Sequence, residues 1–268
     1  MPLILCGTPI GNLDDAAPRL AATLGGCDVV FAEDTRRTRI LLDRLGVDVP
    51  LRSYFAGNER QRADELARRL ESGETVGLVT DAGMPSISDP GVSAVDIARS
   101  VGAPITVVPG PSAVTAALAV SGLPSDRFVF EGFLPRSGRD RQARIQDIAI
   151  ESRTVVFFAS PRRVGADLRD IAAVAGEERE IFVARELTKV HEELWWGALG
   201  EAAERFAGDQ RGEFTIVLAR AHPQPPDMQA AVEAVRTLVE EGEPMSSAVR
   251  IVAERSGVSR RTLYEAML

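Results

Sequence analysis

The sequence contains little histidine, cysteine and lysine. Its 268 residues include two histidines, His191 and His222, two cysteines, Cys6 and Cys27, and one lysine, Lys189. So few histidines exclude most metal sites and most histidine-dependent catalytic triads, and no metal is expected. The cysteines have no metal-ligand spacing, and we expect both to be unpaired structural residues in a reducing compartment.

Long apolar runs and common nucleotide-binding motifs are also missing. The first apolar stretch reaches Gly7 after six residues, which is too short for a signal peptide, and no run approaches the roughly 18 residues of a membrane span. No G-x-G-x-x-G opens the first predicted helix and no phosphate-binding G-x-x-x-x-G-K-S/T occurs, so the usual dinucleotide and nucleoside triphosphate cradles are absent. We therefore expect a cytoplasmic protein that does not enter a membrane and builds its ligand site from other loops.

The net charge of −8 argues against binding nucleic acid by overall attraction. Local arginine clusters stand out against this acidic background. They are Arg36-Arg37-Thr38-Arg39, the group Arg136, Arg139, Arg141 and Arg144, and the pairs Arg162-Arg163 and Arg260-Arg261. Any one cluster alone is explained as well by a solvated surface.

Short apolar runs alternate with segments of helical periodicity, which is typical of α/β folds with a mainly parallel sheet. We predict strands at 3–6, 29–32, 76–80 and 105–108, with helices at 35–45, 59–70, 92–100 and 112–120. Beyond the turn-forming residues 121–126, strands are predicted at 128–131, 154–159, 180–184 and 214–219, with helices at 139–150 and 163–174 and a hairpin through 194–197. The prediction is two α/β domains, at 1–121 and 122–220, the second with a mixed sheet.

A proline-rich linker at 221–226 leads to a predicted helical appendage over 227–268, with helices at 228–241, 246–255 and 259–267. Ala253, Gly257 and Leu263 stand where a helix-turn-helix needs a small residue, a tight turn and a core residue. Ser259 is expected to cap the last helix. This pattern fits a nucleic-acid contact and a small packing bundle equally well.

Four loops rich in glycine, proline and polar residues follow predicted strands, at 7–13, 33–36, 81–91 and 109–113. Open α/β sheets place their ligands at the carboxyl ends of their strands. Glycine lets the backbone approach a ligand closely, proline fixes the loop, and the helix opened by Ser112 offers free amides to an anion. One such loop is ordinary turn chemistry, whereas four on one edge predict a binding site.

These loops and the second half of the chain contain several longer motifs. They are Gly7-Thr8-Pro9-Ile10-Gly11-Asn12-Leu13, Glu33-Asp34-Thr35-Arg36, Asp81-Ala82-Gly83, Ser88-Asp89-Pro90-Gly91, Pro109-Gly110-Pro111-Ser112-Ala113, Gly122-Leu123-Pro124-Ser125-Asp126-Arg127-Phe128, Glu131-Gly132-Phe133-Leu134-Pro135, Ala184-Arg185-Glu186-Leu187-Thr188-Lys189 and Gly212-Glu213-Phe214. Together they resemble the ribosomal RNA small subunit methyltransferase I family, within the tetrapyrrole methylase superfamily. The resemblance spans nearly the whole chain.

The resemblance implies a two-domain α/β enzyme, usually a homodimer, that binds S-adenosylmethionine (S-adenosyl-L-methionine) between its domains. The implied reaction methylates the ribose 2′-oxygen of a cytidine in the decoding region of 16S ribosomal RNA, in the small ribosomal subunit. At matching positions, the implied cofactor contacts are Pro9, Ile10, Gly83, Met84, Pro85, Ile87, Ser112 and Ala113, with Phe158, Ala184 and Gly212 from the second domain.

The sequence departs from the family pattern at three places. Met84 replaces a threonine, Ala159 and Arg162 replace an acidic residue and a histidine, and the stretch at 54–57 replaces a histidine-rich one. Neither Ala159 nor Arg162 can be an indispensable base in this protein.

A ribose hydroxyl must be aligned with the methyl group and must lose its proton. Candidate acceptors are Glu33, Asp34, Asp89 and Glu186, and our hypothesis is that Asp34 or Glu186 polarises the hydroxyl while Arg36 holds a phosphate. Alternatively, residues 33–36 and 185–186 form structural ion pairs at a domain or dimer interface. RNA contacts are expected from the segment 136–144, from Arg162-Arg163, and from Arg250, Arg260 and Arg261.

Two other functions fit parts of the sequence. A small-molecule methyltransferase of the tetrapyrrole type would share the sheet and the cofactor cleft, but it would gain nothing from the appendage. A non-enzymatic regulator would bind DNA through the appendage and sense a metabolite through the α/β part, without turnover.

Overall fold

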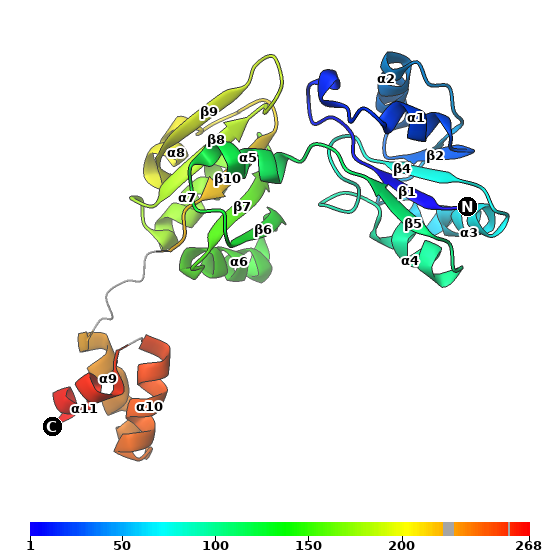
Figure 1. Ribbon diagram of the computed structural model, residues 1–268. Coiled ribbons are helices and arrows are strands. Elements are labelled where there is room, and N and C mark those ends of the chain that lie inside the picture. Colours follow the sequence, from blue (N-terminus) through cyan, green and yellow to red (C-terminus); the bar gives the residue numbers. More distant parts are fainter. Residues whose placement is uncertain (222–227, 257) are drawn as a thin grey trace. The chain divides into compact units, whose positions relative to one another are not determined.

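The computed structural model describes residues 1–221, 228–256 and 258–268, which fall into two compact units, Met1–Arg220 and Ala221–Leu268 (Figure 1). Residues 222–226 of the predicted linker, residue 227 at the start of the predicted appendage, and Gly257 of the predicted tight turn lie outside the described residues. The first unit contains two five-stranded sheets.

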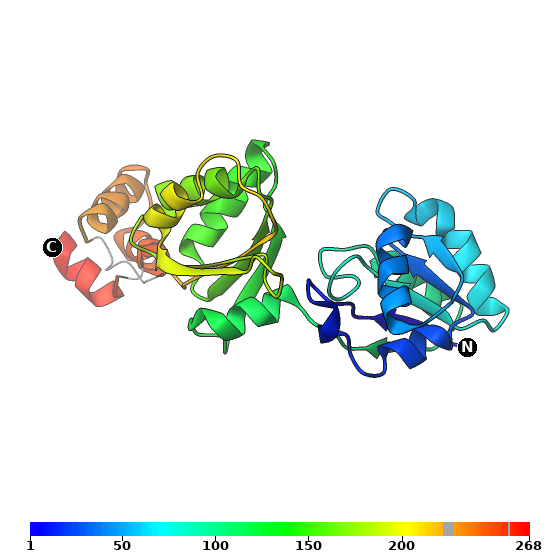
Figure 2. The same ribbon diagram turned by 90° about the horizontal axis from the view of Figure 1, so that it is seen from above.

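The first sheet is parallel throughout and has the strand order β3-β2-β4-β1-β5. Its elements are β1 (Leu3–Cys6), the short helix η1 (Leu13–Asp15), α1 (Leu20–Gly25), β2 (Val29–Ala32), α2 (Thr35–Leu45), β3 (Leu51–Ser53), α3 (Glu59–Glu71), β4 (Val76–Val79), α4 (Val92–Ser100) and β5 (Ile105–Val108). Helices α1 and α2 cover one face and α3 and α4 the other (Figures 1 and 2). Burial on both faces explains why β1, β2 and β4 are apolar at nearly every position.

The second sheet is mixed and has the order β6-β7-β10-β8-β9. Its elements are β6 (Phe128–Phe133), α6 (Gly138–Ile150), β7 (Thr154–Ala159), α7 (Val164–Ala175), β8 (Glu180–Arg185), β9 (Glu193–Ala198), α8 (Leu199–Arg205) and β10 (Phe214–Leu218). Among neighbouring strands of this sheet, β6 and β7 are parallel, whereas β10 is antiparallel to both β7 and β8, and β9 is antiparallel to β8. The mixed sheet predicted from the sequence is confirmed.

The hairpin of this sheet is placed differently from the prediction. Residues 194–197 were expected to form the connection, but they lie inside β9 and pair with β8. The chain reverses before Glu193 instead, where Glu186 and Thr188 adopt positive φ angles of 52° and 66°. Trp195 and Trp196 therefore belong to the strand, where aromatic side chains pack well, and not to the turn.

Helix α5 (Ala113–Ser121) joins the two halves of the unit. Its buried residues Val114, Ala117 and Leu118 pack with Val156 of β7 and Val217 of β10, so it covers one face of the second sheet. Helices α6, α7 and α8 cover the other face. The predicted domain limit between residues 121 and 122 stays a prediction, but the helix expected to close the first domain packs on the second sheet.

The second unit contains α9 (Met228–Glu240), α10 (Met245–Ser256) and α11 (Arg260–Met267). Val235, Ala248 and Leu263 are fully buried at its centre. The predicted cap on the last helix is confirmed, because the Ser259 hydroxyl accepts the Thr262 amide at 3.1 Å. No helix among the described residues is long and apolar enough to cross a membrane.

Candidate active site

The loops after β1, β4 and β5 are joined by backbone hydrogen bonds at the carboxyl edge of the first sheet. Thr8 and Gly83 exchange amide–carbonyl bonds of 2.9 and 3.1 Å, and the Gly7 amide donates to Val108 at 2.9 Å. A Cβ atom on Gly7 would lie 2.6 Å from the amide nitrogen of Gly110. Glycine is therefore required where these two loops touch, and the three loops form one rigid floor.

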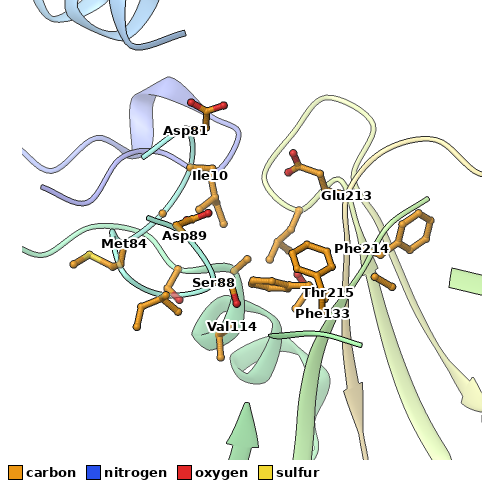
Figure 3. A pocket seen from close by; sticks show the side chains of 18 of the residues that line it. Ile10, Asp81, Met84, Ser88, Asp89, Val114, Phe133, Glu213, Phe214 and Thr215 are labelled. Atoms are coloured by element: carbon orange, nitrogen blue, oxygen red, sulfur yellow. The ribbon is translucent and has the colours of Figure 1, made fainter. Parts of the chain in front are cut away.

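A cavity of about 370 Å³ lies on this floor, between the loops of the first sheet and the ends of β6, β7 and β10 (Figure 3). The first half of the chain contributes Ile10, Glu33, Arg37, Asp81, Ala82, Gly83, Met84, Ile87, Ser88, Asp89, Ser112, Ala113 and Val114. The second half contributes Phe133, Phe158, Ala159, Ser160, Pro161, Leu187, Glu213, Phe214 and Thr215. The volume falls in the range of small-molecule pockets, roughly 300–1,000 Å³, and the wall combines apolar surface with a few polar groups.

The apolar wall from the second sheet is built around Phe158. Its ring centre lies 5.1 Å from that of Phe130 and 5.5 Å from that of Phe133, in edge-on and tilted arrangements. Such aromatic contacts hold the ring in place beyond what burial alone provides. Phe158 therefore offers a fixed flat surface to a ligand.

The polar side of the cavity contains the start of α5. Ser112 has extended backbone angles at the N-cap position, and its side chain makes no capping hydrogen bond. The first amides of a helix have no partner within the helix, and they favour a carboxylate or another anion.

Three of the four carboxylates that line the cavity, Glu33, Asp81 and Asp89, come from the first half of the chain, and the fourth is Glu213. The Asp81 amide donates to Glu33 Oε2 at 3.2 Å, and the Asp34 amide donates to Asp81 Oδ1 at 3.0 Å, so the loops after β2 and β4 are bonded in both directions. Arg37 pairs with Asp81 at 2.9 Å. Two of the three carboxylates are thereby tied to the protein.

The pKa of Asp89 is raised to about 7, first by burial and next by the negative charge of Glu33. Burial also raises the pKa of Glu33, although the Asp81 amide opposes this. A carboxyl group whose pKa lies near neutrality can accept and release a proton under physiological conditions. This corner of the cavity is suited to proton transfer.

Seven of the predicted cofactor contacts line the main cavity, namely Ile10, Gly83, Met84, Ile87, Ser112, Ala113 and Phe158. Pro9 lines an adjoining cavity of about 230 Å³ that shares Ile10, Arg37, Asp81, Ala82 and Glu213 with the first. Pro85, Ala184 and Gly212 are not among the lining residues of either cavity. These eleven contacts stay predictions.

The predicted catalytic residues do not line the main cavity. Asp34 caps α2 through the Arg36 amide at 2.8 Å and pairs with the Arg36 side chain at 3.0 Å. The hydrogen bond from that side chain lowers the pKa of Asp34 to about 2. Such a carboxylate is a weak base, whereas the Arg36 side chain, although paired with Asp34, is 90% exposed and within reach of an external phosphate.

Glu186 lies in a turn that carries an ion cluster. It pairs with Lys189 at 2.8 Å and accepts the Glu213 amide at 2.8 Å. Burial raises the pKa of Glu186, but Lys189 and this amide outweigh it and leave the pKa below its ordinary value. Glu186 therefore forms an ion pair, as in the structural alternative to a catalytic role, and its partner is Lys189.

The main cavity also contains side chains that the sequence did not single out, chiefly Arg37, Asp81, Phe133 and Glu213. Arg37 belongs to the arginine cluster at 36–39, and the other three lie within the motifs quoted above. Their positions in this cluster and in these motifs were the sequence features that could have identified them as site residues. Among the residues described by the structure, no group of three or more His, Cys, Asp or Glu side chains could hold a metal ion.

Comparison with known proteins places this geometry in a family. Residues 2–203 match the Tetrapyrrole (Corrin/Porphyrin) Methylases, and residues 226–268 match the RsmI C-terminal HTH domain. A ribosomal RNA small subunit methyltransferase I from Mycobacterium tuberculosis is 45% identical over 99% of this chain and 94% of its own length. A protein of the same name from Xylella fastidiosa is 43% identical over 98% of this chain and 97% of its own.

The chain belongs to the ribosomal RNA small subunit methyltransferase I family. Solved structures share the fold of this family's α/β part at low sequence identity. Uroporphyrin-III C-methyl transferase from Thermus thermophilus, complexed with S-adenosyl homocysteine, has a TM-score of 0.59 at 17% identity and covers 81% of this chain and 96% of its own. The methyltransferase CobJ has a TM-score of 0.62 at 18% identity and covers 82% and 94%. The predicted fold class is thereby confirmed.

Proposed function

We propose that this protein transfers a methyl group from S-adenosylmethionine to the ribose 2′-oxygen of a cytidine in the decoding region of 16S ribosomal RNA. The observation that carries the proposal is the match to relatives named as small-subunit ribosomal RNA methyltransferases over nearly their full length, helical appendage included. Both units of this chain take part in the match, so the match supports the same RNA substrate for the whole chain.

The cavity fits the cofactor. The unpartnered amides at the start of α5 suit the carboxylate of its methionine part, and the fixed Phe158 ring and Ile10 suit an apolar or aromatic part. We propose that Pro9, Ile10, Gly83, Met84, Pro85, Ile87, Ser112, Ala113, Phe158, Ala184 and Gly212 hold it. The cofactor supplies a methyl group that its sulfonium already activates, so the protein's own tasks are alignment and removal of a proton.

RNA binding is proposed for exposed arginines near the cavity. Arg136 follows the end of β6 and Arg162 follows the end of β7, and the Arg163 side chain donates to the Arg136 carbonyl at 2.7 Å, which brings these two segments together. Both Arg136 and Arg162 are exposed, as is Arg139 on α6. We propose that these three and Arg36, which Asp34 holds in place, contact phosphates.

Not every predicted arginine is available for this role. Arg141 is buried between Asp167 and Asp170, and Arg144 pairs with Glu131. In the second unit, Arg250 and Arg260 pair with Glu254 and Arg261 pairs with Glu265. We expect a smaller contribution from Arg141 and Arg144, whose side chains are 9% and 45% exposed, than from Arg36, which is also paired but is 90% exposed.

The remaining proposals concern assembly and location. We propose a homodimer that acts in the cytoplasm on the small ribosomal subunit, as the family resemblance implies. Analytical ultracentrifugation of the full chain tests the dimer. A sedimentation coefficient typical of a 28.8 kDa monomer at micromolar concentration would contradict it.

The decisive experiment transfers labelled methyl from S-adenosylmethionine to small subunits from cells that lack this enzyme. The modified nucleotide is mapped by its resistance to alkaline cleavage, because 2′-O-methylation blocks that reaction. Label on one cytidine of 16S RNA supports the proposal. Cofactor binding without label on any RNA would favour a small-molecule methyltransferase, and ligand binding with no turnover of any kind would favour a regulator.

A further inference from the structure

The loop that carries Asp89 is held in an unusual conformation at the cavity wall. Ser86 and Ser88 have positive φ angles of 72° and 61°, a region that residues other than glycine seldom occupy. The Ser86 amide donates to the Pro90 carbonyl at 3.1 Å, and the Gly91 amide donates to Glu59 Oε1 at 3.2 Å. Strained conformations of this kind gather at functional sites, where the surrounding bonds maintain them.

This loop directs the Asp89 carboxylate into the cavity (Figure 3). Four other charged groups line the same cavity: Glu33 after β2, Arg37 on α2, Asp81 after β4 and Glu213 before β10. Arg37 pairs with Asp81, and Glu213 pairs with Lys189. Glu33 is bonded to the Asp81 amide. No lysine or arginine among the described residues forms an ion pair with Asp89, and the Thr80 side chain is the group that opposes the rise of its pKa.

We propose that Asp89 is the catalytic residue that accepts the proton of the ribose 2′-hydroxyl during methyl transfer. This inference rests on the proposed function and names the acceptor that it leaves open. The O–H bond breaks toward the Asp89 carboxylate, and the hydroxyl oxygen forms a bond to the methyl carbon. The methyl–sulfur bond breaks at the same time and its electron pair remains on sulfur, so charge and atoms balance.

The electrostatics of the cavity support this role. Burial and the neighbouring charge of Glu33 raise the pKa of Asp89 to about 7. At neutral pH the Asp89 carboxyl is therefore ionised in a large fraction of the molecules and is able to accept a proton. Asp34, which carries a much lower pKa because of Arg36, would hold such a proton far less well. General-base efficiency is greatest when the pKa lies near the working pH.

Asp89→Asn removes the acceptor with little change in size, and Asp89→Glu keeps a carboxylate there. In single-turnover methylation of small subunits, we expect Asp89→Asn to slow transfer by about 100- to 10,000-fold. We expect S-adenosylmethionine affinity, measured by calorimetry, to stay within about threefold, and Asp89→Glu to recover part of the rate. Asp96→Asn, an exposed acid on α4 that makes only a 3.9 Å pair with Arg99, is the matched control and should behave as wild type.

Glu33→Gln provides a readout that a merely structural role would not produce. Removing this like charge lowers the pKa of Asp89, so the rise in rate with pH should move to lower pH. Carbon-13 spectra of aspartate-labelled protein should show the same shift of the Asp89 carboxyl titration without any turnover.

These experiments distinguish a failure of the Asp89 role from a failure of the proposed methyl transfer. An active wild type together with an Asp89→Asn variant that stays within tenfold of it would overturn this inference alone. A wild type that binds cofactor but methylates no ribose would overturn the proposed function and this inference with it. A large loss in Glu33→Gln with none in Asp89→Asn would transfer the role to Glu33.

Discussion

The guanidinium of Arg141 lies 2.8 Å from the Asp167 carboxylate in the interior between α6 and α7, where the two side chains are 9% and 4% exposed. A second carboxylate, Asp170, lies 2.6 Å away on the exposed side, and the Pro135 carbonyl accepts a further bond from Arg141. An arginine expected from the sequence to reach RNA is therefore part of the packing of the second sheet. Its position connects α6, α7 and the turn after β6.

The first prediction concerns the stability of this cluster. Arg141→Ala leaves the buried Asp167 carboxylate with only the more distant Arg163 guanidinium, 3.9 Å away, and we expect the free energy of unfolding to fall by about 3–5 kcal/mol. Urea unfolding followed by the fluorescence of Trp195 and Trp196, both in the second sheet, measures this change. Arg139→Ala, on the exposed side of the same helix, is the control and should change stability by less than about 0.5 kcal/mol. Equal losses for both variants would contradict the structural role.

The second prediction concerns the contact between Gly7 and Gly110. Gly110→Ala places a methyl group 2.7–2.8 Å from backbone atoms of Gly7, so the two loops must move apart. We expect calorimetry to show S-adenosylmethionine affinity at least about tenfold weaker, because Ser112 and Ala113 follow directly on this loop. Gly25→Ala, whose new methyl group comes no closer than 3.8 Å to any neighbour, should leave the affinity unchanged.

The third prediction follows from the raised pKa of Asp89. The folded protein keeps this proton up to a pH of about 7, whereas the unfolded chain loses it near the ordinary value of 3.8. The unfolded state therefore binds fewer protons between these values, and this group makes the protein less stable as the pH rises from about 4 to 7. Asp89→Asn avoids that loss.

We accordingly expect Asp89→Asn to be more stable than wild type at pH 8 and about equal to it at pH 4, in urea unfolding at both pH values. Asp96→Asn supplies the comparison at an exposed position. A difference between Asp89→Asn and wild type that did not depend on pH would contradict the raised pKa.

The fourth prediction concerns RNA contact. Arg162→Ala should weaken binding of 16S RNA and should lower the slope of log K against log salt concentration by about 1, since one phosphate contact is lost. Filter binding between about 50 and 200 mM salt measures the slope. Arg153→Ala is the control, because Arg153 precedes the opposite end of β7 and pairs with Glu151 at 2.7 Å. Its slope should equal that of wild type.

The fifth prediction concerns the two thiols. Burial raises the pKa of Cys6 to about 12, and burial together with Asp28 raises that of Cys27 to about 11. Since the thiolate is the reactive form, neither should react with a disulfide reagent at pH 8 in the native state. Both should react in urea, and rapid labelling of the folded protein would show an opening that the structure does not contain.

Most of the fold could be predicted because parallel strands that are buried on both faces consist of short, continuous apolar runs. Val29–Ala32 and Val76–Val79 are short apolar runs between helical segments. The short elements η1, α1, β3 and α8, which have three, six, three and seven residues, went unpredicted, and most of β9 was expected to be a turn. In β3, Leu51–Ser53, every residue is half-buried and only one is apolar, so neighbouring strand β2 decides its conformation.

The position of the site could be predicted from the sequence, but the roles of its individual carboxylates could not. Glycine and proline mark the loops, because they are needed for the backbone geometry itself. Which carboxylate is free depends on cations elsewhere: Asp34 meets Arg36, Glu186 meets Lys189 and Asp81 meets Arg37. The first two pairs are local, but the third joins residues 44 apart in the sequence. No pattern along the chain shows which acids meet such distant cations, and so Asp89 could not be separated from the others.

The central position of β10 has a consequence for how the chain is made. The first sheet is complete once Val108 has been synthesised, whereas the second must wait for Phe214–Leu218 before β7 and β8 can be joined. Until then β7 and β8 each present an unpaired edge in the middle of a future sheet, which invites association with other chains. We expect nascent or truncated chains that end before Phe214 to need chaperones far more than chains that end after Arg220.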